Sequence, residues 1–317
     1  MIEKNDLRII FMGTPEFAVA SLDILVKNNY NIIGVVTATD KPAGRGNKLQ
    51  TSAVKQYAEK NQLLVLQPEK LKSPEFIEQL KALKPNLFVV VAFRMLPEIV
   101  WDMPQFGTFN LHASLLPQYR GAAPINWAVI NGEKETGVTT FFLQHEIDTG
   151  NIIFQDKIKI TEQDNAGNIH DKLMQIGAAL VLKTVQAIET NEVQSYAQTS
   201  NLQSNNLILQ HAPKIFKETC LIDWNNSAEK IQNLIRGLSP YPAAFTYLDN
   251  KTLKIYRSII NEERNHAETS IGNFYTDGKT FLSFRAADAF VDILELQIEG
   301  KKKMTITDFI RGHRFNL

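Results

Sequence analysis

Two side chains that could act on a carbonyl group stand two residues apart near the middle of the chain. They are Asn110 and His112, in the stretch Phe109-Asn-Leu-His112. Residues two apart on a β-strand project from the same face, so the amide and the imidazole are predicted to lie side by side. An amide donor beside a titratable ring suits the polarisation and protonation of a carbonyl oxygen. A strand-end asparagine and a structural, hydrogen-bonded histidine would have the same spacing.

A loop rich in proline and glycine follows this pair directly. It runs from Ala113 to Pro124 and contains Ser114-Leu-Leu-Pro117 and Gly121. Ligands of open α/β sheets usually bind beyond the carboxyl ends of the strands, where such a loop lies. The loop is therefore predicted to line a binding site.

A third segment, Gln144 to Gly150, contains Asp148-Thr-Gly150 between two predicted strands. Asp-x-Gly is most often turn chemistry. If the turn folds back over the strand end, the Asp148 carboxylate would orient His112 or accept a proton. The residues alone leave both interpretations of Asp148 open.

The elements that must position these residues alternate between short β-branched runs and helix-like segments. Such alternation predicts a parallel sheet, and Leu87–Phe93, which has no polar alternation, is typical of a central strand covered on both faces. We therefore expect a doubly wound, Rossmann-like α/β domain. The predicted strands are 8–12, 31–37, 63–66, 87–93 and 108–112, with a hairpin of 137–143 and 151–160, and the predicted helices are 16–28, 52–60, 73–83, 125–130 and 166–189.

The composition changes between Glu192 and Asn206 to Gln, Ser, Asn and Thr, which indicates a linker. A predicted helix, Ser227–Leu238, then precedes a series of short strand-like runs. This pattern predicts a small C-terminal β-barrel, OB-like in type. The expected strands are 244–248, 252–258, 271–275, 281–284, 291–298 and 304–309, and the expected division is a domain at 1–190, a linker at 191–207 and a domain at 208–317.

The composition excludes several classes of protein. The 317 residues are 44% hydrophobic and 21% charged, as in ordinary globular proteins. Lys and Arg total 34 and Asp and Glu total 34, so no overall field attracts nucleic acid or an anionic membrane. The single cysteine, Cys220, excludes an intramolecular disulfide and a zinc site of several thiolates. We expect its thiol to be buried and the compartment to be reducing.

Signals for membranes and for common cofactors are also missing from the sequence. The longest apolar stretch, Leu87–Phe93, is far shorter than the ~20 residues that span a bilayer, and the N-terminus lacks the apolar region of a signal peptide. We therefore expect a cytoplasmic monomer with no membrane partner. Met12-Gly-Thr-Pro15 stands where a dinucleotide-binding fold has Gly-x-Gly-x-x-Gly, which argues against a nicotinamide or flavin cofactor.

Taken together, the motifs Asn110-x-His112, Ser114-Leu-Leu-Pro117 with Gly121, and Asp148-Thr-Gly150 resemble the signature of the formyltetrahydrofolate-dependent formyltransferases. Further segments are similar to the members of that family that formylate methionyl initiator tRNA. The resemblance covers nearly the whole chain. The further segments are Phe11–Ala18, Lys41–Gln50, Ile222-Asp-Trp224 and Ile235-Arg236.

This resemblance implies transfer of a formyl group from the co-substrate 10-formyltetrahydrofolate to the α-amino group of methionine on initiator tRNA, for translation initiation. It implies that Asn110 and His112 stabilise a tetrahedral intermediate, and that Asp148 orients the imidazole and helps to move the amine proton. It implies no metal. It assigns folate binding to Ser114, Leu115, Leu116 and Pro117.

Contacts to tRNA are expected from basic residues in two parts of the chain. One set lies in the loop Asp40–Gln50, whose glycines and proline surround three cations, and the other lies in the C-terminal domain. Both sets could instead be ordinary solvated surface charges. The first set is Lys41, Arg45 and Lys48, and the second is Lys214, Lys217 and Arg236, near which Lys301–Lys303 would extend one stripe.

Three further functions fit the same residues. A formyltransferase for a small amine, such as glycinamide ribonucleotide or an amino sugar, would share the same three catalytic residues. The second domain and the basic loop argue against so small an acceptor. A formyltetrahydrofolate hydrolase is the second of these functions, and a non-catalytic RNA-binding protein is the third. The intact set of Asn110, His112 and Asp148 argues against a non-catalytic protein.

Overall fold

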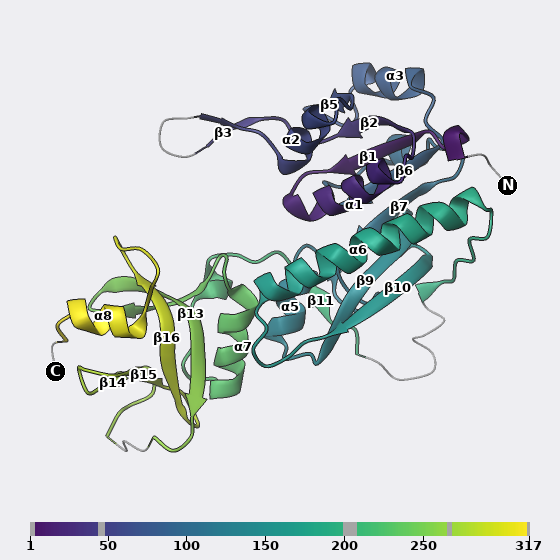
Figure 1. The fold of residues 1–317 in the computed structure, drawn as a ribbon. Coiled ribbons are helices and arrows are strands. Elements are labelled where there is room, and N and C mark those ends of the chain that lie inside the picture. The colour runs from purple at the N-terminus through teal and green to yellow at the C-terminus, as the bar shows by residue number, and fades with distance from the viewer. Residues whose placement is uncertain (1–3, 44–47, 199–207, 265–267, 316–317) are drawn as a thin grey trace. The chain divides into compact units, whose positions relative to one another are not determined.

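The computed structural model describes residues 4–43, 48–198, 208–264 and 268–315 (Figure 1). The chain divides into two compact units, which we call unit 1 and unit 2. Unit 1 comprises Met1–Gly121, Gly137–Ile158 and His170–Gln210, and unit 2 comprises Ala122–Thr136, Lys159–Ile169 and His211–Leu317. Two short segments, 122–136 and 159–169, thus pack with the C-terminal part of the chain from residue 211 onward.

Unit 1 is built on a seven-stranded sheet in the order β10-β9-β7-β6-β1-β2-β5. Strands β5, β2, β1, β6 and β7 run parallel, and β9 pairs with β7 in the antiparallel direction. This confirms the predicted doubly wound α/β domain. The strands are β1 (Ile9–Gly13), β2 (Ile32–Val36), β5 (Val65–Leu66), β6 (Leu87–Val91), β7 (Thr108–His112), β9 (Glu135–Phe142) and β10 (Ile152–Lys159).

The middle strand of this sheet is β6, and all five of its residues are buried. Its apolar run therefore has the position that its composition predicts. Beside it, Gly13 ends β1 where no side chain fits, because a Cβ there would lie 2.7 Å from Ala18 Cβ and 3.0 Å from the Val91 carbonyl oxygen. Close packing of the backbone therefore accounts for the glycine in Met12-Gly-Thr-Pro15.

Two helices of unit 1, predicted at 52–60 and 73–83, begin at serine caps. Ser52 Oγ accepts a hydrogen bond from the Lys55 N–H at 3.0 Å, and Ser73 Oγ accepts one from the Phe76 N–H at 3.3 Å. The last helix, α6, packs on β9, where Thr184 and Thr140 share a hydrogen bond of 2.8 Å between their hydroxyls. The helices are α1 (Glu16–Lys27), α2 (Ala53–Lys60), α3 (Pro74–Ala82), α4 (Glu98–Trp101) and α6 (Ala166–Glu189).

The basic loop predicted at 40–50 contains a short antiparallel pair, β3 (Lys41–Ala43) and β4 (Lys48–Gln50). At its start the Asp40 carboxylate accepts hydrogen bonds from Lys55 Nζ at 2.6 Å and Gln67 Nε2 at 2.8 Å. These bonds hold the pKa of Asp40 below its usual value. The base of the hairpin is therefore tied to α2 and to the residues after β5.

Unit 2 contains an antiparallel, curled sheet in the order β12-β13-β16-β15-β14, with β17 paired to β16 (Figure 1). No pairing among the described strands joins β12 to β14, so the sheet forms a half-barrel. It packs on α7 (Ala228–Leu238), and Trp224 stacks on Phe284 in the core at 4.8 Å between ring centroids. The strands are β12 (Ala244–Leu248), β13 (Lys251–Asn261), β14 (Phe274–Thr276), β15 (Leu282–Arg285), β16 (Phe290–Ile298) and β17 (Met304–Thr305).

One predicted strand of unit 2 is wrong. Residues 304–309 form a strand only at Met304–Thr305, and a helix, α8 (Ile306–Gly312), follows. Thr305 begins this helix, because its hydroxyl accepts a hydrogen bond from the Asp308 N–H at 3.2 Å. The cap, with an acidic residue three positions later, outweighs the β-branched run that suggested a strand.

The helix predicted at 125–130 belongs to unit 2 rather than to the α/β unit. This helix, α5 (Pro124–Ile130), packs against α7, where Asn126 Nδ2 donates to the Gly237 carbonyl at 2.7 Å. A Cβ at Gly237 would lie 2.4 Å from Ile130 Cγ1, so the glycine permits the close packing. The remaining short elements are η1 (Lys4–Asp6), β8 (Arg120–Gly121), β11 (His211–Ala212) and η3 (Glu218–Cys220).

Cys220 is buried in the core of unit 2, as the sequence predicts. Burial raises the pKa of its thiol. A protonated, buried thiol is a poor nucleophile, so the residue serves as core packing.

Candidate active site

Asn110 and His112 lie at the carboxyl end of β7, between β6 and β9. Asn110 is paired in register with Val90 on β6 and with Phe141 on β9, while His112 is opposite Thr139 on β9. The strand alternation therefore brings the amide and the imidazole to one face, as predicted. Asn110 is half-buried and His112 is buried.

The imidazole of His112 is held through Nε2, which lies 2.8 Å from the Tyr119 carbonyl oxygen. A carbonyl oxygen only accepts hydrogen bonds, so Nε2 carries the proton in the neutral ring and Nδ1 presents a lone pair. Nδ1 lies 3.9 Å from Asp148 Oδ2. In the neutral ring the Nδ1 lone pair therefore lies on the side of the Asp148 carboxylate.

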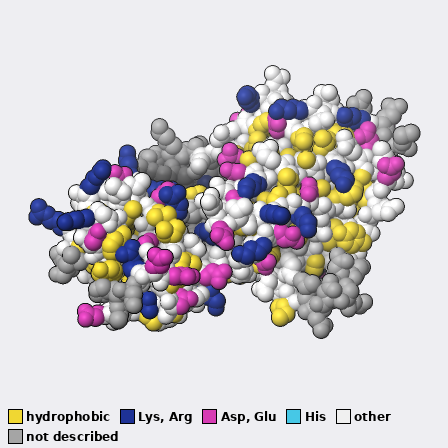
Figure 2. Space-filling view, turned by 60° about the horizontal axis from the view of Figure 1, so that its bottom comes forward, with side chains coloured by type: hydrophobic (Ala, Val, Ile, Leu, Met, Phe, Trp, Pro, Cys, Tyr) yellow, Lys and Arg dark blue, Asp and Glu magenta, His cyan; other side chains and the backbone are white. Residues whose placement is uncertain are grey.

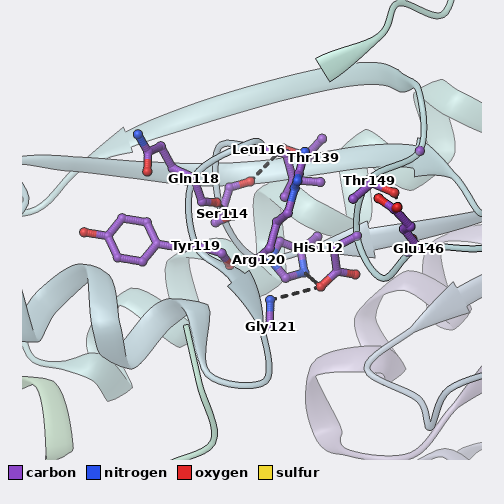
Figure 3. Close-up of polar contacts among 12 residues, drawn as sticks. His112, Ser114, Leu116, Gln118, Tyr119, Arg120, Gly121, Thr139, Glu146 and Thr149 are labelled. Atoms are coloured by element: carbon purple, nitrogen blue, oxygen red, sulfur yellow. Dashed lines mark hydrogen bonds and ion pairs between the residues drawn. The ribbon is translucent and has the colours of Figure 1, made fainter. Parts of the chain in front are cut away.

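Asp148 reaches this position from the turn after β9. Its φ is +55°, in the left-handed region that Asp tolerates better than most residues. Its Oδ2 accepts a hydrogen bond of 3.0 Å from the Gly121 N–H (Figure 3). Gly150 allows the turn, because a Cβ there would lie 1.6 Å from the Phe142 carbonyl oxygen. Asp-x-Gly therefore forms a turn and also directs a carboxylate toward His112.

Side chains within and beside the loop after β7 form hydrogen bonds with the backbone of that loop (Figure 3). Ser114 Oγ donates to the Gln118 carbonyl at 2.6 Å, and Thr139 Oγ1 donates to the Ser114 carbonyl at 2.6 Å. The same Thr139 oxygen accepts from the Leu116 N–H at 3.1 Å. Gln155 Nε2 donates to the Leu116 carbonyl at 2.8 Å and to Thr139 Oγ1 at 2.9 Å. The loop is thus preorganised by two residues, Thr139 and Gln155, that the sequence did not indicate.

The four predicted folate-binding residues differ in accessibility. Ser114 and Leu116 are buried, whereas Leu115 and Pro117 are half-buried. Leu115 packs over Gly137, where a Cβ would lie 2.5 Å from Leu115 Cδ2. Only part of this set therefore offers side chains to a ligand, and the peptide groups of the loop are the other available surface.

A further contributor comes from the segment that the composition marks as linker. Gln198 is buried, and its amide donates to the Asp148 and Gly150 carbonyls. Nearby, Tyr196 pairs with Ile152 by backbone hydrogen bonds of 2.9 and 3.0 Å. Residues 196–198 are thus a structured part of unit 1, while 199–207 lie outside the described residues. A glutamine in a polar tract carries no signal that would have indicated this role.

Arg120 places a guanidinium next to the same turn. Burial lowers its pKa, and the nearby Asp148 and Glu146 carboxylates raise it. The group remains a cation at neutral pH because an arginine pKa lies far above 7. The site therefore brings a guanidinium and the Asp148 carboxylate close to the imidazole at the end of β7.

The basic residues predicted to contact tRNA are not all placed on the described surface. Lys41 is exposed, Arg45 lies outside the described residues, and the side chain of Lys48 is not described. Lys214 and Lys217 are exposed, and the Lys214 ammonium lies 5.6 Å from the centroid of the Phe216 ring.

Arg236 is used inside unit 2. Its guanidinium donates to the Thr161, Glu162 and Asp164 carbonyls at 2.9, 3.0 and 2.9 Å. Burial lowers its pKa, and the acidic residues 162 and 164 raise it. The arginine that the sequence assigns to tRNA thus has a structural use.

Charges of both signs are interspersed over the face shown in Figure 2, in keeping with the net charge of +0.

Among the described residues, no group of three His, Cys, Asp or Glu side chains is arranged to hold a metal ion. No helix in the described ranges is both long and apolar enough to cross a membrane.

Two family models match the chain. The model described as "Formyl transferase" matches residues 7–185, and the model described as "Formyl transferase, C-terminal domain" matches residues 214–314. The first match contains Asn110, His112 and Asp148.

Curated proteins that resemble the chain do so over nearly their whole length. A methionyl-tRNA formyltransferase of Bacteroides fragilis is 55% identical over 98% of this chain and 96% of its own length. The methionyl-tRNA formyltransferase of Flavobacterium johnsoniae is 51% identical over 98% of this chain and 97% of its own length.

Solved structures with a similar fold are less alike in sequence. A sugar 3N-formyl transferase solved in the presence of dTDP and 5-N-formyl-THF has a TM-score of 0.67 and 23% identity, and covers 93% of this chain and 99% of its own. The N-formyltransferase from Helicobacter canadensis, solved with folinic acid and dTDP-3-aminofucose, has a TM-score of 0.66 and 22% identity over 94% of this chain and all of its own. With both family models matched and relatives above 50% identity along its length, the chain belongs to the formyl transferase family.

Proposed function

We propose that this protein transfers the formyl group of 10-formyltetrahydrofolate to the α-amino group of methionyl initiator tRNA, as a methionyl-tRNA formyltransferase. The observation that carries this proposal is the extent of the similarity: relatives of that name are 51–55% identical over 98% of the chain, unit 2 included. A relative that shared only the α/β unit would support formyl transfer without supporting the tRNA acceptor.

In the proposed reaction the neutral amine attacks the formyl carbon, a new C–N bond forms, and negative charge collects on the formyl oxygen. Collapse of this intermediate breaks the bond from carbon to the folate nitrogen. The amine loses a proton and the departing nitrogen gains one. Asn110 supplies an amide donor for the developing charge, at the end of a rigid strand.

His112 and Asp148 account for the proton transfers. Because Nε2 of His112 is engaged by the Tyr119 carbonyl, Nδ1 is the nitrogen that exchanges a proton with the reacting groups. Asp148 Oδ2, at 3.9 Å, is close enough to balance the charge of the ring once Nδ1 is protonated. The amine proton would pass to the departing folate nitrogen directly or through a water molecule.

The substrates are proposed to bind on two surfaces. The loop Ser114, Leu115, Leu116 and Pro117 would receive the folate, through its peptide groups and its half-buried side chains. The cations proposed for tRNA are Lys41, Arg45, Lys48, Lys214, Lys217 and Arg236, although the donors of Arg236 already meet backbone carbonyls. The cytoplasmic location, the monomeric state and the domain limits at 190 and 208 stay predictions.

Formyl transfer from 10-formyltetrahydrofolate should be compared for four acceptors: methionyl initiator tRNA, methionyl elongator tRNA, an amino sugar nucleotide and glycinamide ribonucleotide. We expect kcat/KM to be highest for methionyl initiator tRNA. Preferred transfer to either small amine would contradict the proposed tRNA acceptor but would still support formyl transfer. Release of formate with every acceptor absent would indicate a hydrolase.

A further inference from the structure

Gln198 satisfies every polar atom of its side chain inside the candidate site. It is 2% exposed, and its Nε2 donates to the Asp148 carbonyl at 2.8 Å and the Gly150 carbonyl at 2.9 Å. Its Oε1 accepts from Arg120 Nε at 3.0 Å and also from Nη2. A buried amide with this many partners costs stability if any one of them is removed.

The two carbonyls that Gln198 contacts lie on either side of Thr149. Its amide therefore fixes the peptide groups of the turn that presents Asp148. The φ of +55° at Asp148 is sparsely populated by non-glycine residues and persists where the surroundings hold it. The carboxylate starts from this main chain, so its direction depends on that φ.

The other end of the arrangement is the strand β8. Arg120 holds the Gln198 oxygen, while the next residue, Gly121, donates its N–H to Asp148 Oδ2 at 3.0 Å. Both the main chain and the carboxylate of Asp148 are thus tied to residues 120 and 121. The bonds close a ring, through Gln198 on one side and through the carboxylate on the other.

We infer that Gln198 is a positioning residue for the reaction, which acts with Arg120 to hold the Asp148 carboxylate beside His112. The inference rests on the proposed function in one respect, because it takes Asp148 to move the amine proton. The backbone pairing of Tyr196 with Ile152 delivers Gln198 to the turn. Residues 196–198 therefore contribute to catalysis although their composition is that of a linker.

The test compares three variants of the full chain: Gln198→Ala, Gln198→Glu and, as a matched control, Gln79→Ala on the exposed face of α3. We expect Gln198→Ala to lower kcat by roughly 10- to 100-fold, since small misplacement of a catalytic group costs that much. The KM of both substrates should stay within about twofold, because the substrates bind elsewhere. Gln198→Glu should behave like Gln198→Ala, since a carboxylate cannot donate to two carbonyls. Unchanged kcat in Gln198→Ala would overturn the inference.

A double-mutant cycle separates positioning from a general loss of folded protein. If Gln198 acts through Asp148, Gln198→Ala should cost less than about twofold in an Asp148→Asn background. If the fold-losses in kcat of the two single variants simply multiply in the double variant, the inference is overturned. Gln198 would then affect turnover independently of Asp148.

Hydrogen exchange gives a readout that does not depend on the acceptor. Peptides that span residues 144–151 should exchange faster in Gln198→Ala than in the wild type. In Gln79→Ala their exchange rate should equal that of the wild type. Equal exchange in all three proteins would overturn the inference. A wild-type protein that fails to formylate methionyl-tRNA would contradict the proposed function alone, and the exchange comparison would still decide the role of Gln198.

Discussion

Two carboxylates, one in each unit, show how the two halves of this molecule use charge. Asp292 on β16 accepts hydrogen bonds from Arg264 at 3.0 and 3.2 Å, from Asn261 at 2.9 Å, and from Ser283. Asp148 accepts one, from the Gly121 N–H, and stands 3.9 Å from His112 Nδ1. The carboxylate of unit 2 is saturated, whereas that of unit 1 keeps acceptor capacity for a reacting group.

The two sheets explain this difference. Asp292 lies on β16 between β13 and β15, directly opposite Ser283, which donates to it. Asn261 at the end of β13 and Arg264 just after that strand supply its other hydrogen bonds. Asp148 lies in the turn after β9, and its carboxylate reaches His112 at the carboxyl end of β7, in a sheet whose central strands are buried. Polar groups gather there because the strands themselves have no solvated face. Unit 1 should therefore determine turnover and unit 2 stability and affinity.

The largest effect on turnover is expected from the set at the end of β7. His112→Ala should lower kcat by at least ~100-fold, because it removes a group that stabilises charge and moves a proton. Asn110→Ala and Asp148→Ala should behave similarly, and the three losses should be far from additive since the residues act together. Single-turnover formyl transfer with saturating substrates measures this, with circular dichroism as a check on folding. Near-normal kcat in His112→Ala would contradict the catalytic role of the site at β7, and with it the contrast between Asp148 and Asp292.

Asp292 should affect stability and its pH dependence instead. Burial raises the pKa of Asp292, but hydrogen bonds from Arg264, Asn261 and Ser283 outweigh it and hold the pKa below its usual value. A depressed folded-state pKa contributes stability that is complete above the unfolded pKa of about 3.9 and is lost as pH falls through the folded pKa.

We therefore expect Asp292→Asn to lower the free energy of unfolding by about 2 kcal/mol at pH 7, as for a hydrogen bond to a charged group. Below about pH 4 the variant should lose less stability than the wild type. Urea unfolding followed by tryptophan fluorescence, to which Trp224 in the core of unit 2 contributes, measures both. A tenfold loss of kcat in the folded variant would contradict the assignment of Asp292 to structure.

Thr139 should affect the folate site with a smaller effect. Thr139→Val removes the hydroxyl that donates to the Ser114 carbonyl and accepts from the Leu116 N–H, so the loop loses its support. We expect the Kd of the folate donor to rise by about tenfold, the cost of one or two unsatisfied buried groups. Thr140→Val is the matched control, because its hydroxyl bonds to Thr184 on α6 instead. Equal damage to folate binding by both variants would show that general loosening of β9 is the cause.

The smallest effect is expected from the exposed cations of unit 2. Lys214→Gln and Lys217→Gln should each weaken tRNA binding by a few-fold, leave kcat unchanged, and reduce the salt slope of the affinity by about one. Lys81→Gln, on an exposed face of α3, is the control. Unchanged affinity and slope in both variants, measured by filter binding between 50 and 200 mM salt, would remove the proposed affinity role of these two residues.

Much of the fold follows from local patterns in the sequence. The run Leu87–Phe93 predicts a buried central strand, and Ser52 and Ser73 predict the starts of two helices, because periodicity and capping depend on neighbours within a few residues. Residues 304–309 show the limit of this reasoning. There a cap at Thr305 competes with a β-branched run, and the balance depends on packing that the local pattern does not contain.

The sequence by itself determined the chemistry that the site offers: an amide and an imidazole on one face of a strand, and an aspartate in a turn. Only the tertiary structure decided which His112 nitrogen faces the carboxylate, that Thr139 and Gln155 hold the loop, and that Gln198 reaches the Asp148 turn across 50 residues. These contacts join segments distant in the chain. The sequence pattern around a polar side chain does not indicate which distant residue it will bond to. Side-chain type is local information, whereas the partners of a buried hydrogen bond are a property of the packed fold.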